Sequence, residues 1–184
     1  MPTFIRLAGD KAFEDRDDFV FVADGEPVAA RGDIVIVVTL ARLVSEGDGL
    51  LSAGRSVGVR LQPSEAVEDM AYDLPRLSLV QLVFAKFRDG RPYSSARLLR
   101  ERYGYQGEIR AVGDVLREQA QHMIRCGFDA FEPADGSTAE QWAAAAQRYR
   151  HVYQPAADGR APIYREREQD ARGLGHNRPD KVGA

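Results

Sequence analysis

The sequence predicts an α/β protein in which alternating βαβ units form a mainly parallel sheet. Short apolar runs rich in β-branched residues alternate with segments whose apolar residues recur at helical spacing. The connections between them are short, which favours parallel strands and right-handed crossovers. Of the 184 residues, 44% are hydrophobic, enough for a globular core. The pattern leaves open whether the sheet is open or a partial barrel.

The N-terminal region is expected to hold a lead-in followed by a β-hairpin. Residues 1–16 are mixed and charged, so we expect a loose lead-in. The apolar run 19–23 is followed by Asp24-Gly25 and by residues 27–30. An Asp-Gly pair between apolar runs favours a hairpin.

The remaining chain up to residue 153 is expected to complete a single domain over residues 17–153. Apolar runs predict strands over residues 34–38, 56–61, 77–84, 108–112 and 128–131. Helical spacing and helix-end residues predict helices over residues 39–52, 63–74, 92–103 and 114–127, with a last one at 142–149.

The C-terminal segment differs in composition from the rest. Residues 154–184 carry few apolar residues and no periodicity. We expect a mobile, disordered tail there, because such a segment cannot bury enough apolar surface to order itself.

Composition and motifs exclude several classes of function. The only cysteine is Cys126, late in a predicted helix, where a buried structural role is favoured over a reactive one. No CxxC motif is present, and His122, His151 and His176 are scattered without metal-ligand spacing. No dinucleotide fingerprint, P-loop or hydrolase elbow occurs either. No cofactor or metal site is therefore evident in this chain, and enzyme activity stays undecided.

Charge and hydropathy bound the location and the partners. The net charge of −3 argues against nucleic acid as a partner. We find no basic region followed by an apolar run at the N-terminus, and no apolar stretch long enough to span a membrane. A cytoplasmic protein without a membrane partner is expected.

The first candidate site follows the predicted strand 77–84. Asp89 and Gly90 form a loop that leads into a helix carrying Arg91, Ser94 and Arg97. Such a loop offers backbone N–H groups, and guanidinium and hydroxyl groups suit an oxyanion. The structural alternative is equally simple: Asp-Gly is a common turn, and the arginines are solvated or paired with nearby carboxylates.

The second candidate site lies on the next predicted strand. Alternation puts Glu108 and Arg110 on one face, and a mid-strand arginine is costly to bury unless it is paired. We expect Arg110 to pair with Asp89 or with Asp114, giving an ion pair or an anion site. Residues 86–125 hold nine Lys or Arg against five Asp or Glu, a local basic excess beside these loops.

Three motifs in this region carry a family resemblance. They are Phe87-Arg-Asp-Gly-Arg-Pro-Tyr-Ser-Ser-Ala-Arg-Leu-Leu-Arg100, Gly107-Glu-Ile-Arg-Ala-Val-Gly-Asp-Val115 and Arg125-Cys-Gly-Phe-Asp-Ala-Phe131. The chain resembles, over about residues 33–132, a bacterial family of unknown function described as probable oxidoreductases involved in assimilatory sulfite reduction. Ala85 stands where the family has proline, and Glu118 where it has aspartate.

The resemblance implies an accessory or oxidoreductase-associated protein of sulfite or sulfate reduction. Its arginine-rich face, with Arg91, Arg97 and Arg110, would bind a small oxyanion or dock on the sulfite reductase. A non-catalytic interaction module and an α/β enzyme unrelated to sulfur are the alternatives. The oligomeric state is not indicated.

Overall fold

A computed structural model describes residues 3–8, 11–16, 19–28, 35–52 and 54–174. Eight strands form one sheet in the order β2-β1-β8-β7-β6-β5-β4-β3. Strands β3 to β8 run parallel to one another, whereas β1 is antiparallel to both β2 and β8. The predicted α/β class with a mainly parallel sheet is confirmed. The strands are β1 (Thr3–Ala8), β2 (Lys11–Arg16), β3 (Phe19–Phe21), β4 (Val35–Thr39), β5 (Val57–Leu61), β6 (Leu79–Phe84), β7 (Glu108–Gly113) and β8 (Ala130–Phe131).

Helices connect most of the parallel strands. They are α1 (Leu40–Ser52), the 3-10 turns η1 (Val67–Met70) and η2 (Leu74–Arg76), α2 (Arg91–Arg97), the π-helical turn η3 (Leu98–Arg102), the 3-10 turn η4 (Arg117–Gln119), α3 (Ala120–Cys126), α4 (Ala139–Ala146) and α5 (Ile163–Leu174). The helix expected over residues 63–74 is replaced by η1 and η2. Pro75 lies within η2 and has no N–H to continue a helical ladder.

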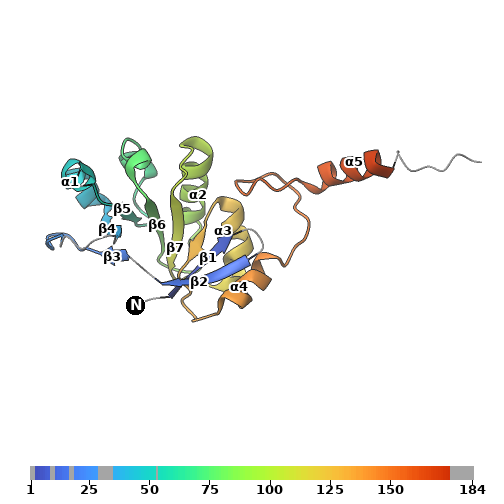
Figure 1. Ribbon diagram of the computed structural model, residues 1–184, viewed down its shortest axis with the longest axis horizontal. Coiled ribbons are helices and arrows are strands. Elements are labelled where there is room, and N and C mark those ends of the chain that lie inside the picture. Colours follow the sequence, from blue (N-terminus) through green and yellow to red (C-terminus); the bar gives the residue numbers. More distant parts are fainter. Residues whose placement is uncertain (1–2, 9–10, 17–18, 29–34, 53, 175–184) are drawn as a thin grey trace, which may run out of the picture.

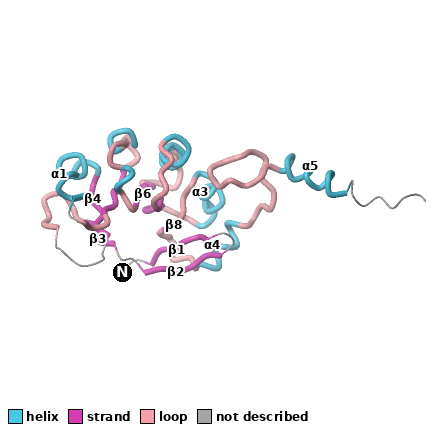
Figure 2. The backbone as a smooth tube through the Cα atoms, turned by 45° about the horizontal axis from the view of Figure 1, so that its top comes forward, coloured by secondary structure: helices cyan, strands magenta, loops and turns pink. Residues whose placement is uncertain are grey.

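The sheet is curled into a half-barrel (Figures 1 and 2). Six strand spacings separate β1 from β3 in the sheet order, which in a flat sheet would be roughly 29 Å. The rings of Phe4 on β1 and Phe19 on β3 are nevertheless 6.3 Å apart. Only two residues join the end of β2 to the start of β3, a reach of about 11 Å at most. The two ends of the sheet are therefore brought close together.

The curled sheet has an outer and an inner face that differ in character. The outer face is apolar, and its residues, such as Val59, Leu82 and Ile109, are buried in the main core beneath the helices. The inner face carries Arg60, Gln81 and Arg110 in register on three neighbouring strands. Period-two alternation produces this separation, because each strand sends successive side chains to opposite faces.

The predicted N-terminal hairpin exists, but at another place. It is formed by β1 and β2, so residues 1–16, expected as a loose lead-in, hold both of its strands. The chain does turn at Asp24-Gly25, where Gly25 has φ 82°. Strand β3, however, pairs in parallel with β4 instead of folding back onto residues 27–30. Of that range, residues 29–30 lie outside the described residues.

The C-terminal segment begins against the body and then leaves it. Asp158 pairs with Arg125 of α3 at 3.2 Å, and the Ala157 N–H donates to the Arg125 carbonyl at 3.1 Å. Helix α5 then projects away from the sheet and its helices (Figures 1 and 2). Residues 175–184 of the expected tail lie outside the described residues. Within the described ranges, no helix has the length and apolar character needed to cross a membrane.

Candidate functional site

The β6–α2 loop begins where the ends of β6 and β7 approach closely. The Asp114 N–H donates to the Phe84 carbonyl at 2.8 Å. Gly113 has φ 97°, and a Cβ there would lie 2.5 Å from the Phe84 carbonyl oxygen. Only glycine fits both conditions. The Asp114 carboxylate then accepts the Phe87 N–H at 2.8 Å, so Asp114 holds the loop in place.

Asp89 and Arg91 satisfy each other within this loop. The Asp89 carboxylate accepts hydrogen bonds from the Arg91 backbone N–H at 3.1 Å and from its Nε and Nη2 at 2.9 and 2.7 Å. The side-chain hydrogen bond with Arg91 lowers the pKa of Asp89, and the same bond raises the pKa of Arg91. This arrangement matches the structural alternative of a turn with a local ion pair.

Gly90 does not need to be glycine for backbone reasons. Its φ is −83° and its ψ is −13°, which any residue adopts. A Cβ at this position would meet nothing within 4 Å. The position is therefore open and would accept a side chain.

Ser94 and Arg97 line a shallow hollow on the exposed side of α2. Its volume is about 550 Å³, and Leu98, Glu101 and Arg102 complete the lining. Arg97 pairs with Glu101 one turn later at 2.9 Å. Arg102 is exposed and forms no ion pair with the residues that the structure describes. The hollow is therefore a surface depression with one engaged and one available guanidinium.

Arg110 lies elsewhere, on the inner face of the sheet, and its side chain is only 1% exposed. It pairs with Glu108 at 2.7 Å, and its guanidinium lies 3.7 Å from the Phe4 ring and 4.1 Å from the Phe19 ring. The expected pairing with Asp89 or Asp114 is wrong. Arg110 points inward from mid-strand, whereas both aspartates belong to loops beyond the strand ends.

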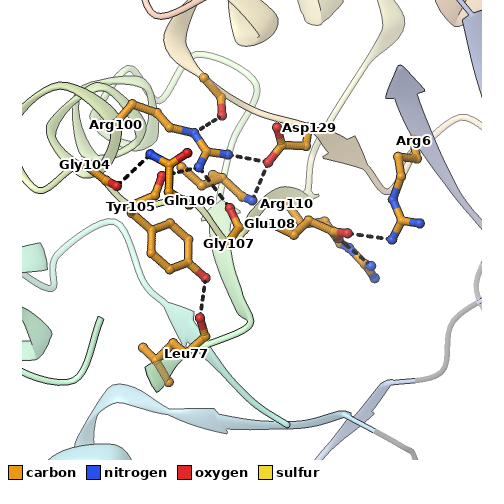
Figure 3. Close-up of polar contacts among 12 residues, drawn as sticks. Arg6, Leu77, Arg100, Gly104, Tyr105, Gln106, Gly107, Glu108, Arg110 and Asp129 are labelled. Atoms are coloured by element: carbon orange, nitrogen blue, oxygen red, sulfur yellow. Dashed lines mark hydrogen bonds and ion pairs between the residues drawn. The ribbon is translucent and has the colours of Figure 1, made fainter. Parts of the chain in front are cut away.

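Arg100, which is not among the predicted site residues, holds together several loops (Figure 3). Its guanidinium donates to the carbonyls of Gly127 at 3.0 Å and Gly107 at 2.9 Å, and also to the Tyr105 carbonyl. It pairs with Asp129, whose carboxylate accepts the Ile109 N–H at 2.8 Å. The motif Arg-Leu-Leu-Arg gave no signal of this role, because residues three apart share one face of a helix and Arg97 is exposed.

A second cluster missed at the sequence level joins α2 to α3. The rings of Tyr93 and His122 lie 4.6 Å apart, and the Cys126 Sγ is 4.0 Å from His122 Nε2. Gln119 donates to the Tyr93 hydroxyl at 3.0 Å.

Burial sets the protonation of this cluster. It raises the pKa of the Cys126 thiol, and it lowers the pKa of His122, with Arg125 and Arg97 contributing in the same direction. Cys126 is buried, as expected. A protonated thiol beside a neutral imidazole is an inert pair at neutral pH.

The seven predicted site residues thus fall in three places. Asp89, Gly90 and Arg91 lie where the β6–α2 loop enters α2, and Asp114 follows β7 and holds that loop through the Phe87 N–H. Ser94 and Arg97 line the hollow on α2, and Arg110 is enclosed on the inner face of the sheet. Among the described residues, no group of three or more His, Cys, Asp or Glu is placed to hold a metal ion.

The β6–α2 loop, α2 and η3 carry several exposed cationic side chains. Lys86, Arg88 and Arg102 are exposed and form no ion pair with described residues, while Arg91 and Arg97 are 62% and 54% exposed. These five residues run from the β6–α2 loop to the last residue of η3, and we call them the basic face. Only two carboxylates, Asp89 and Glu101, pair with them.

Comparison with known families gives one match. Residues 58–164 match the model of a bacterial protein family of unknown function, DUF934. The chain belongs to DUF934. The match starts at β5 and ends in the first turn of α5, so it includes the basic face and both clusters around α2 and α3. A search of curated proteins found no match. The predicted membership of a bacterial family of unknown function is confirmed, and the link to sulfite reduction stays a prediction.

Proposed function

We propose that this DUF934 protein is an accessory protein of assimilatory sulfite reduction that docks on the sulfite reductase through its basic face. The metabolic assignment rests on the family resemblance carried by residues 87–100, 107–115 and 125–131. The proposal places the protein in the cytoplasm with its partner.

The observation that carries docking is the unpaired charge of the basic face. The basic face holds five exposed cations, and only two carboxylates pair with them. The net charge of the whole chain is −3. Such a local field attracts an acidic protein surface and speeds encounter with it.

The geometry favours docking over capture of a free oxyanion. A small-anion site needs several donors that converge in a sheltered pocket. Here Arg91 and Arg97 already have carboxylate partners, the hollow beside Ser94 is shallow, and Arg110 is enclosed on the inner face. The described α2 and α3 residues also place no activated nucleophile in this region.

Growth of a deletion strain tests the metabolic assignment. A strain that lacks the protein is expected to grow poorly on sulfite as sulfur source and normally on cysteine. Equal growth on both sources would overturn the sulfur assignment and favour an unrelated α/β protein.

Charge reversal tests the docking surface. Arg88→Glu with Arg102→Glu is expected to weaken binding to purified sulfite reductase by roughly tenfold, about 1.4 kcal/mol, with the remaining binding falling as salt rises. The control Lys11→Glu with Arg55→Glu changes the charge equally, far along the chain from the basic face, and is expected to bind normally. Loss in both double variants, or binding insensitive to salt, contradicts docking through the basic face.

A further inference from the structure

An apolar pocket lies beside the basic face, where η3 ends. Its volume is about 340 Å³, and most of its surface is apolar. One wall comes from the segment that runs through η2 to β6 and includes Ala71, Leu74 and Leu77, and the other wall is residues 103–107 of the η3–β7 loop. None of the lining residues is charged, whereas the lining of the hollow on α2 includes two arginines and a glutamate.

Hydrogen bonds hold the two walls of this pocket in place (Figure 3). The Tyr105 hydroxyl donates to the Leu77 carbonyl at 3.2 Å, which ties one wall to the other. The Arg100 guanidinium donates to the carbonyls of Tyr105 and Gly107, the latter at 2.9 Å. Because these bonds already fix the walls, a ligand does not have to order them when it binds.

Arg102 joins this pocket to the basic face. It lines the hollow on α2, and its guanidinium lies 5.8 Å from the centre of the Tyr103 ring, which lines the pocket. On the other wall, the exposed Glu68 and Asp69 of η1 come shortly before Ala71 in the chain. The η3 side of the pocket is therefore positive and the η1 side negative.

Charge and apolar surface contribute differently to a protein–protein contact. Exposed charges mainly steer the encounter and select the partner, and they add little affinity. Affinity comes mainly from a few apolar or aromatic side chains that are buried in pockets of the partner. The basic face supplies the first contribution, and the adjoining pocket supplies the second. A volume of about 340 Å³ is at the small end of the range for ligand pockets, which suits an anchoring side chain better than a large cofactor.

We propose that this pocket takes an aromatic or aliphatic anchor side chain from an acidic protein segment. The carboxylates of that segment lie on the Arg102 side, along the basic face, because the negative charge of η1 disfavours the reverse placement. The inference rests on the docking role proposed for the basic face, but not on sulfite reductase as the partner.

Three labelled peptides test the pocket in the full-length protein, with binding followed by fluorescence anisotropy. The first joins a run of glutamates through a glycine to one phenylalanine. In the second, alanine replaces the phenylalanine, and in the third, glutamine replaces every glutamate. Each peptide is made in two orders, because a segment can cross the pocket in either chain direction, and the tighter order is compared.

The first peptide is expected to bind roughly tenfold more tightly than either of the other two. Equal binding of the first and second peptides would show that the pocket takes no anchor. Equal binding of the first and third would show that the basic face takes no part. Either result overturns the proposal, and so does a first peptide that does not bind.

Filling the pocket separates its contribution from that of the charge. Ala71→Phe places a ring at the pocket wall and is expected to weaken the first peptide roughly tenfold, to the level of the second, while binding still falls as salt rises. Ala144→Phe adds the same side chain to an exposed position of α4 and should bind like the wild type. Arg102→Glu is expected to weaken both acidic peptides. Full binding by Ala71→Phe contradicts the pocket, and melting temperatures check that each variant folds.

Purified sulfite reductase gives a result that is separate from the peptides. Protein that distinguishes the first peptide from the second but does not bind the reductase supports the pocket and overturns the proposed partner. Binding to the reductase that Ala71→Phe leaves unchanged supports the proposed partner and overturns the pocket.

Discussion

Two glycines, one at the end of β7 and one in the β6–α2 loop, show that the same residue type can be required at one position and replaceable at another. Gly113 sits where β7 passes the end of β6, at positive φ and in contact distance of a backbone carbonyl. Gly90, six residues after β6, has an ordinary helical φ and open space around it. From sequence alone Gly90 was the more prominent, because it lies in Asp-Gly-Arg. The sequence does not display a positive φ or a neighbouring strand.

Alanine at these two positions should have opposite effects on stability. Gly113→Ala places a Cβ against the Phe84 carbonyl at positive φ, so we expect the free energy of unfolding to fall by about 2–3 kcal/mol. Gly90→Ala fits the native backbone and restricts the unfolded chain, and a gain of about 0.4–1 kcal/mol is expected. Urea unfolding of both variants measures the difference. A neutral Gly113→Ala would show that the ends of β6 and β7 are not in close contact.

At the scale of elements, the sequence predicts those strands that a local apolar pattern marks. The runs around Val37, Val59, Leu82 and Ile109 are continuous apolar segments, and each became a parallel strand at the expected place. Strands β1 and β2 were missed because their charged residues hide the alternation, although Phe4 and Ile5 are both buried. The candidate site residues do not lie together for a related reason. Loops that follow neighbouring parallel strands meet at one edge of the sheet, whereas a mid-strand side chain such as Arg110 points to one face of it.

Arg100 of η3 contacts the loops before β7 and before β8. Replacing Arg100 by lysine tests how much these contacts stabilise the fold. One guanidinium reaches carbonyls in the η3–β7 loop and the α3–β8 loop, together with the Asp129 carboxylate. An ammonium group has no planar fork to reach all of them, so Arg100→Lys is expected to lower the free energy of unfolding by about 2–3 kcal/mol.

Arg97→Lys is the matched control for this clamp, in the same helix. Arg97 is exposed and, among the described residues, its only ion pair is with Glu101 one turn later, so a change within about 0.5 kcal/mol is expected. Equal losses in the two variants, measured by chemical denaturation, would show that the contacts of Arg100 add no more than a surface pair.

At the scale of the whole molecule, the N-terminal strands hold the curl of the sheet. Strands β1 and β3 stand six places apart in the sheet order, yet Phe4 and Phe19 meet over the guanidinium of Arg110. Periodicity in the sequence gives each strand its two faces but not the angle between strands. The choice between an open sheet and a partial barrel was therefore undecidable from the residues. Arg110, read as a site residue, is instead the buried centre of this closure.

A double-mutant cycle on Phe4 and Phe19 measures the closure directly. Phe4 is 2% exposed, so Phe4→Ala is expected to cost about 3–5 kcal/mol, and Phe19→Ala less because Phe19 is partly exposed. The two rings contact each other and share the Arg110 guanidinium, so their effects should depart from additivity by about 0.5–1.5 kcal/mol. In a flat sheet the two residues would be roughly 29 Å apart and their effects would add. Strict additivity would thus contradict the curled sheet, whereas coupling between the second and the last strand of the sheet order requires it.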